Sequence, residues 1–306
     1  MNRLEANISL FAITFFASIQ YVFLIWVPDS VPHFAFLCVT NLIGLVMSLA
    51  FFFGELFRLD VKQVKQSMVL SGQLVAFNIF LLMGVSGLGP AMINAILSTN
   101  FVFIATIVFL ENKRIPDKGT FFGILTVFAG LMFMSEAGIS DFLNVSVLDL
   151  TASNIAFAFY VVSVGKYSVS SNPSIIAMGQ MFFCFVFSLI LWVAEVIVKG
   201  VPFGLPSNHE FWGSVIYVSF FIRGLYGIVQ VYAQRYVSPL NTSLIFSTEI
   251  IMTMAVSPVL SEFLGTEPEI ITWPKVFGGV AIVLGIMMTE PAFFAWLRRL
   301  IVREKP

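Results

Sequence analysis

Ten apolar segments, each long enough to cross a membrane as a helix, follow one another along the chain. A helix needs roughly 20 mostly apolar residues to span the hydrocarbon core of a bilayer. The segments are 5–27, 34–54, 67–87, 89–110, 118–137, 149–169, 174–198, 211–234, 239–261 and 274–296. They do not alternate polar and apolar residues, as the strands of a membrane barrel would. Because helices satisfy their backbone polar groups internally, we predict an all-α integral membrane protein with ten transmembrane helices.

The composition agrees with a chain whose solvent is lipid. Of 306 residues, 58% are hydrophobic and 11% are charged, whereas soluble domains carry about 25% charged residues. The net charge of -1 provides no basic field for nucleic acid. The two histidines, His33 and His209, lie in expected loops, and no metal-binding spacing occurs. We therefore expect no metal, no cofactor, no nucleic-acid partner and no enzymatic activity.

Cationic residues gather on alternate connections between the segments. Lysine and arginine accumulate on the cytoplasmic side of membrane proteins. One predicted side holds Arg3, Arg58, Lys62, Lys65, Lys113, Arg114, Lys118, Lys166, Arg235, Arg298, Arg299, Arg303 and Lys305. The other side holds only Lys199 and Lys275, and Arg223 lies within a segment. We expect a multi-pass protein of a bacterial cytoplasmic membrane with both termini in the cytoplasm.

The two halves of the chain have similar patterns. In each half an apolar run ends in a glutamate, Glu111 or Glu262, and a short polar loop and a glycine-dotted run follow. Five segments per half is an odd number, so the second copy must enter the membrane in the opposite direction. We predict two inverted five-helix repeats, 1–147 and 148–306. Inverted repeats of this kind are typical of secondary transporters, which bind their substrate near the bilayer midplane.

This pattern resembles the EamA-type transporters of the drug/metabolite transporter superfamily, over nearly the whole chain. The resemblance implies ten helices, with spans 3, 4, 8 and 9 in the centre. Spans 1, 2, 6 and 7 would form movable walls, and spans 5 and 10 would lie at the periphery. Members move metabolites such as amino acids, nucleotide sugars, amines or drugs. The family usually has proline in the helix that ends in glutamate, as at Pro258, but the first copy has none between Pro90 and Glu111.

Two charged residues lie deep within predicted spans. Arg223 is about twelve residues into span 8, and Glu249 is about ten residues into span 9. A charge at the bilayer centre costs about 2.5–3.5 kcal/mol on the insertion scale, so such residues face a cavity or a partner. Either Arg223 binds an anionic group of a substrate while Glu249 binds an ammonium or transfers a proton, or the two form a structural ion pair. The offset of 151 residues between Glu111 and Glu262 places Ser98 opposite Glu249, so the deep carboxylate occurs in one half only.

Other polar residues share helical faces with these charges or lie on central spans. The candidate substrate-binding set is Arg223, Glu249, Tyr226, Gln230, Asn94, Ser98 and Asn41. Amide and hydroxyl side chains also bond neighbouring helices together, which is the alternative role of Asn94, Ser98 and Asn41. Gln20, Gln73, Asn78, Gln180 and Tyr160 are weaker candidates of the same kind. We interpret Glu111 and Glu262 as structural caps or gate contacts.

The leading functional hypothesis is a secondary transporter of a small polar metabolite by alternating access. One deep cation and one deep anion favour a zwitterion, most simply an amino acid. The alternative is a cationic amine or drug-like compound bound by Glu249. A non-transporting receptor or assembly protein, paired through glycine-rich spans 5 and 10, is a third hypothesis. The expected partners are the substrate and the lipid bilayer, with protons as a candidate coupling ion.

Overall fold

The computed structural model describes residues 1–27, 31–58, 60–85, 88–113, 118–135, 144–200, 203–266 and 270–288. Within these ranges the ordered elements are all helices, and no strand occurs. Eight of the described helical segments, which we call rods, are long and apolar enough to cross a membrane; some consist of consecutive helices. Two shorter apolar helices accompany them. The prediction of an all-α membrane fold is therefore confirmed, while the count of ten spans stays a prediction.

The described residues of the first half form six α-helices and one short 3₁₀ helix. They are α1 (Arg3–Trp26), α2 (His33–Phe52), η1 (Phe53–Arg58), α3 (Val61–Gly84), α4 (Pro90–Ser98), α5 (Asn100–Asn112) and α6 (Lys118–Ser135). Helix α3 begins six residues before the predicted span, because its first turns carry the exposed Lys62 and Lys65. Hydropathy finds only the apolar part of a helix, whereas the polar first turns lie where lipid meets water.

The second half forms α7 (Val145–Ser170), α8 (Pro173–Lys199), α9 (His209–Tyr217), η3 (Val218–Tyr226), α10 (Gly227–Ala233), α11 (Pro239–Ser247), α12 (Glu249–Leu264) and α13 (Trp273–Met287). Helices α7 and α8 begin at asparagine caps, Asn144 and Asn172, whose side chains accept bonds from backbone amides. The predicted boundary at 147/148 falls in the first turn of α7. The end of the last predicted span and the basic tail at 298–305 lie outside the described residues.

Two rods are interrupted at corresponding places. A one-residue turn at Thr99 separates α4 from α5, and a turn at Thr248 separates α11 from α12. In both turns the threonine amide bonds the carbonyl three residues back, as in a 3₁₀ turn. The offset between these turns is 149 residues, so Asn100 corresponds to Glu249. The offset of 151 residues, which made Ser98 the counterpart of Glu249, is therefore wrong near these two turns.

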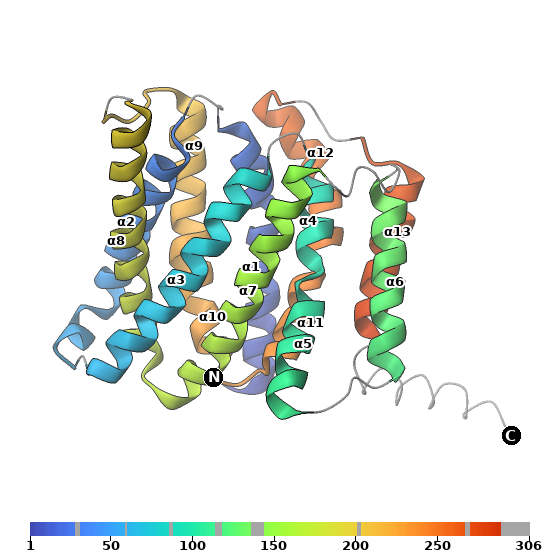
Figure 1. Ribbon diagram of the computed structural model, residues 1–306, viewed down its shortest axis with the longest axis horizontal. Coiled ribbons are helices and arrows are strands. Elements are labelled where there is room, and N and C mark those ends of the chain that lie inside the picture. Colours follow the sequence, from blue (N-terminus) through green and yellow to red (C-terminus); the bar gives the residue numbers. More distant parts are fainter. Residues whose placement is uncertain are drawn as a thin grey trace, which may run out of the picture.

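The rods run up and down through a flat bundle (Figure 1). The N-terminus, the end of α5 and the connection from α7 to α8 lie at the lower edge of the view, with the start of α3. This end, which we call the basic face, bears Arg58, Lys62, Lys65, Lys166 and Arg235. The α4–α5 rod runs toward the basic face and the α11–α12 rod runs away from it. Those opposite directions are what an inverted repeat requires, although the repeat itself stays a prediction.

Contacts between helices cross from one half of the chain to the other. Helix α2 packs against α8, and α6 packs against α13. Helix α1 contacts α12, while its expected counterpart α7 contacts α5. Helix α3 lies on α7 and α8, and η3 lies on α1 and α2. The halves therefore exchange equivalent contacts across the centre of the bundle, and that centre is enclosed by helices of both halves.

Glycines of α6 and α13 bring these two helices into close backbone contact. A Cβ atom at position 130 would lie 2.6 Å from the carbonyl oxygen of Gly278. A Cβ atom at position 285 would lie 2.7 Å from the carbonyl oxygen of Gly123. These glycines thus join the two halves of one chain. They do not form the free glycine-rich faces that pairing between chains through spans 5 and 10 would need.

Candidate functional site

Arg223 lies at the centre of a π-helical segment. The nine residues of η3 form wider turns between the regular helices α9 and α10, and wide turns of this kind occur frequently at functional sites. The Arg223 side chain is 7% exposed. Its Nη2 donates a 2.7 Å hydrogen bond to Oδ1 of Asn78 on α3, whereas its Nε has no hydrogen-bond partner among the described residues. The guanidinium is therefore held in place but only partly satisfied.

Glycine on the neighbouring helix makes room for this arginine. Gly44 of α2 lies so close to η3 that a Cβ atom there would be 2.6 Å from Cβ of Arg223. Gly224 likewise lies against the side chain of Met47, also on α2. The position of Arg223 thus depends on α2, a helix that the family resemblance assigns to a movable wall.

Glu249 is the first residue after the turn at Thr248. It begins α12, and its side chain is 8% exposed. Its Oε1 atom has no hydrogen-bond partner among the described residues. Tyr21 of α1 lies beside its carboxyl group. A buried carboxyl oxygen without a partner costs about 1–3 kcal/mol or more, so this group is unlike a structural carboxylate.

Arg223 and Glu249 do not form an ion pair with each other in the part of the chain that the structure describes. The closed structural pair, one of the two alternatives drawn from the sequence, is therefore wrong for this structure. Both side chains instead line the same cavity, which has about 760 Å³ of space between atoms, its open mouth included. Two buried, opposite charges thus face one enclosed space without neutralising each other.

Helices from both halves surround this cavity. Its polar lining comprises Gln20, Tyr21, Asn78, Asn94, Ser98, Asn100, Asn154, Tyr160, Arg223, Tyr226, Gln230 and Glu249. Six of the seven candidate residues are among them, together with the weaker candidates Gln20, Asn78 and Tyr160. Gln73 and Gln180 do not line it. Gln73 bonds Ser163, and Gln180 bonds Tyr160 from behind.

Asn41, the seventh candidate, does not line the cavity. Its Nδ2 lies 3.3 Å from the carbonyl oxygen of Cys184 and 3.3 Å from Oγ of Ser188, both on α8. Sequence spacing placed Asn41 on a polar face of its helix but did not identify which neighbour that face contacts. In this structure Asn41 links α2 to α8, as an amide that bonds neighbouring helices does.

Asn94 and Ser98 line the cavity and also connect three helices. Asn94 donates to Oγ1 of Thr253 on α12, and Thr253 donates to the carbonyl oxygen of Ser18 on α1. Ser98 donates to Oδ1 of Asn94. Asn154 of α7 bonds the carbonyl oxygen of Ile96 at 2.6 Å, beside the turn at Thr99. These bonds fix the turn of the α4–α5 rod and keep its polar side chains at the cavity.

Aromatic rings line the remaining wall, and of these the sequence identified Tyr160 and Tyr226 but not the phenylalanines. The Phe77 and Phe157 ring centroids are 4.8 Å apart, those of Phe157 and Tyr160 are 5.7 Å apart, and those of Tyr226 and Phe246 are 5.5 Å apart. All five residues line the cavity. With 35 phenylalanines in the chain, no spacing singles out these few, because phenylalanine also faces lipid along every rod.

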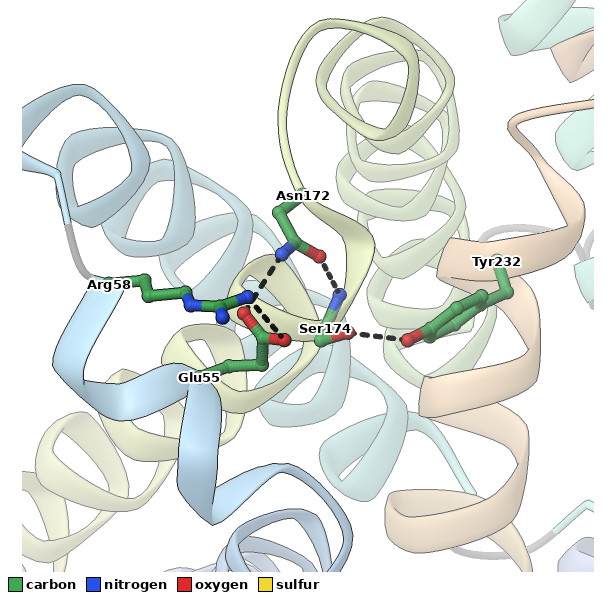
Figure 2. A network of polar contacts seen from close by, with 5 residues as sticks. All are labelled: Glu55, Arg58, Asn172, Ser174 and Tyr232. Atoms are coloured by element: carbon green, nitrogen blue, oxygen red, sulfur yellow. Dashed lines mark hydrogen bonds and ion pairs between the residues drawn. The ribbon is translucent and has the colours of Figure 1, made fainter.

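A polar network joins the halves at the basic face (Figure 2). Asn172, the cap of α8, donates from Nδ2 to Oε2 of Glu55 on η1 at 3.1 Å, and Glu55 pairs with Arg58. The hydroxyls of Ser174 and Tyr232 are 2.5 Å apart, which connects α8 to α10. The contacts of Glu55 with Asn172 tie the first half to the second at one end of the bundle.

The two helix-terminal glutamates differ in their contacts. Glu111 forms an ion pair with Lys166 of α7, with Nζ and Oε1 2.5 Å apart, and so links the halves at the basic face, which agrees with a structural or gate contact. Glu262 is exposed, and no ion pair of its side chain occurs among the described residues. Within the described ranges there is also no group of three histidine, cysteine or acidic residues placed to hold a metal ion.

Comparison with known proteins agrees with this architecture. Residues 146–290 match the model of the EamA-like transporter family, which agrees with the resemblance seen in the sequence. An uncharacterized transporter from Archaeoglobus fulgidus is 24% identical over 201 residues, which cover 64% of this chain and 58% of the relative. A crystal structure of a protein with 15% identity matches with a TM-score of 0.65, over 97% of this chain and 98% of that one. The fold is thus shared over the whole chain, and the family sequence is recognisable in its second half.

Proposed function

We propose that the protein is a secondary transporter of a small zwitterionic metabolite, most simply an amino acid. The observation that supports this proposal is that Arg223 and Glu249 line one cavity without pairing with each other. Keeping a charge at membrane depth is costly, so such residues mark substrate and ion pathways. The family match of the second half and the name of the archaeal relative support transport as the activity.

In this proposal each charge binds the opposite charge of the solute. Arg223 binds the carboxylate, because a guanidinium offers several donors in a planar fork. Asn78 orients that fork through its bond to Nη2 and leaves Nε free to donate. Glu249 binds the ammonium group through Oε1, or carries a proton when no solute is bound. Tyr226, Gln230, Asn94 and Ser98 complete the lining on the polar side.

Alternating access requires that the contacts between the halves break at one face while those at the other face hold. The network of Glu55 and Asn172, together with the ion pair of Glu111 and Lys166, ties the two halves together at the basic face in this structure. We place that face in the cytoplasm of a bacterium, with the lipid bilayer around the rods and one five-helix repeat on each side of 147/148. Thiol labelling of Lys62→Cys from outside intact cells would contradict this orientation.

A second candidate solute is a cationic amine or drug-like compound. Six aromatic rings line the cavity, and the faces of such rings attract cations. In this case Glu249 holds the cation and Arg223 acts only through its bond to Asn78. The receptor or assembly hypothesis loses its motivation, because the glycines of α6 and α13 contact each other within the chain.

Uptake into proteoliposomes tests the proposal and separates the two solutes. Thermal-shift screening of amino acids and amines first finds ligands, since a ligand that binds the folded state raises its apparent stability. A zwitterion site predicts that competitors lacking either the carboxylate or the ammonium group fail to inhibit. Uptake by the variant Arg223→Gln is compared with uptake by Lys65→Gln. Lys65→Gln is the control, because it removes the same charge at an exposed position. Competition by amines without a carboxylate favours the second solute, and the absence of any ligand or uptake contradicts transport of either.

A further inference from the structure

A row of buried polar side chains extends from the cavity toward the basic face. Gln230 of α10 lines the cavity, and Gln234 follows one turn later at the end of the same helix. Thr242 lies in the first turns of α11, one turn before the cavity residue Phe246. Because α10 ends and α11 begins at the basic face (Figure 1), these residues lie between the cavity and that face.

These side chains lack hydrogen-bond partners although they are fully buried. Gln230 is 0% exposed, Gln234 is 2% exposed and Thr242 is 0% exposed. Both polar atoms of each glutamine amide and the hydroxyl of Thr242 have no partner among the described residues. A serine or threonine in a helix can rotate to bond its own backbone. A glutamine amide has a donor end and an acceptor end, and these two amides face the interior with both ends unsatisfied.

The packing of α10 explains why its polar side faces inward. Tyr232 points away from Gln230 and Gln234, because two residues turn a helix by about 200°. Its hydroxyl bonds Ser174 of α8 (Figure 2). Its ring stacks on Phe52 of α2. The opposite side of α10 faces α1 and α7, which α11 also contacts. The glutamines and Thr242 are therefore buried where α10 and α11 pack against α1 and α7.

We propose that Gln230, Gln234 and Thr242 line a water-filled path that connects the cavity to the basic face. Buried polar groups of proteins are nearly always hydrogen-bonded, to protein or to ordered water. The path rests on the proposed function in one respect: if the protein is a transporter, the path is the part of the solute's route that lies between the cavity and the basic face. Water reaches Gln230 along this path whether or not the protein transports a solute.

The side of the cavity that faces away from the basic face has no comparable row of unpartnered polar side chains among the described residues. Beyond Arg223 and Glu249 the unpartnered buried atoms of α9, η3 and α12 are the hydroxyls of Ser219 and Ser257, and Asn208, the N-cap of α9, adds only its Oδ1. Both hydroxyls can donate to their own helix, so they do not require water. Among the described residues, Gln230 and Gln234 are the amides whose donor and acceptor ends are both buried without a partner, and we expect water access from the basic face in this conformation.

Thiol accessibility tests the path without any solute. In a background with Cys38→Ala and Cys184→Ala, single cysteines replace Gln234 and Thr242, and Val231→Cys and Ala233→Cys are controls. The controls are 0% exposed on the same helix and at nearly the same depth. Lys62→Cys marks the basic face, because it is exposed there. A membrane-impermeant cationic methanethiosulfonate is added to proteoliposomes from each side in turn.

We expect Gln234→Cys and Thr242→Cys to react at least about tenfold faster than the controls, and only from the side that labels Lys62→Cys. Reaction no faster than Val231→Cys and Ala233→Cys, or equal reaction from both sides, would overturn the path. Thr242→Cys changes few atoms, so it remains informative if Gln234→Cys does not fold. Labelling that matches our expectation in a protein without uptake would refute the proposed transport and leave the path standing.

Discussion

The two halves of the protein have matching helices but unequal polar centres. At corresponding turns the first half continues with Asn100 and the second with Glu249. The first half contributes neutral amides to the cavity, whereas the second contributes both deep charges, the π-helical segment and Gln230. The first half therefore provides hydrogen-bonding partners such as Asn78, and the second provides the charges. The family model matches only residues 146–290, the half that holds both charges.

We expect the largest effect when the negative charge of Glu249, in the second half, is removed. Glu249→Gln keeps the size of the side chain but loses the carboxylate, so uptake of the solute should fall about 100-fold, or about 2.7 kcal/mol. Net contributions of hydrogen bonds to charged groups are about 1.5–3 kcal/mol. The matched change at the corresponding position, Asn100→Ala, should alter uptake less than about threefold. Equal losses in the two variants would show that the halves share the binding role.

Gly44 offers a way to move Arg223 without changing it. In Gly44→Ala the new Cβ would lie 2.6 Å from Cβ of Arg223, so η3 or α2 must shift and uptake should fall about tenfold. Gly72→Ala is the control, because no atom lies within 4 Å of a Cβ at that position. Both changes improve helix propensity by up to about 1 kcal/mol. Unchanged uptake in Gly44→Ala would show that the exact position of Arg223 is unimportant.

The contact between α6 and α13 is the region where the halves are most alike. Gly130→Ala places a Cβ atom 2.6 Å from the carbonyl oxygen of Gly278, and overpacking of this kind costs about 1–3 kcal/mol. We expect a lower free energy of unfolding in detergent, measured with a denaturant, and an unchanged KM for the solute. A changed KM with unchanged stability would connect this pair to the binding site and contradict the division between central and peripheral helices.

The positions of most helices could be predicted from hydropathy, because a lipid bilayer requires long apolar helices of nearly fixed length. The depths of Arg223 and Glu249 followed from residue counts, since a helix rises about 1.5 Å per residue. The turns at Thr99 and Thr248 could not be predicted, because neither contains glycine or proline. The π-helical segment widens the turns around Arg223. Regular α-helical spacing places Gly227, Gln230 and Gln234 on the same face as Arg223, but of these three residues the cavity includes only Gly227 and Gln230.

The contacts between individual side chains of different helices also could not be predicted from the sequence. Helical periodicity fixes the face of a residue but not the helix that covers it, so Asn41 was assigned to the site when it bonds α8. The same limit left the pairing of Arg223 with Glu249 open until their places around the cavity were known. Asn78 became important only because its oxygen meets Nη2 of Arg223 across a long sequence separation.

The smallest expected effect concerns the contact that ties the halves at the basic face. Asn172→Ser keeps a side-chain oxygen that caps α8 but loses the amide that bonds Glu55. Asn144→Ser is the matched control, because Asn144 caps α7 in the same way, through the backbone amide of Ser146. Losing one such partly exposed bond costs about 1 kcal/mol, equivalent to about fivefold in an equilibrium between closed and open states. Labelling of Gln234→Cys from the basic face should therefore rise up to about fivefold with Asn172→Ser and stay constant with Asn144→Ser. An equal rise with both caps would assign the effect to helix stability, and the first half would then have no part in closing this face.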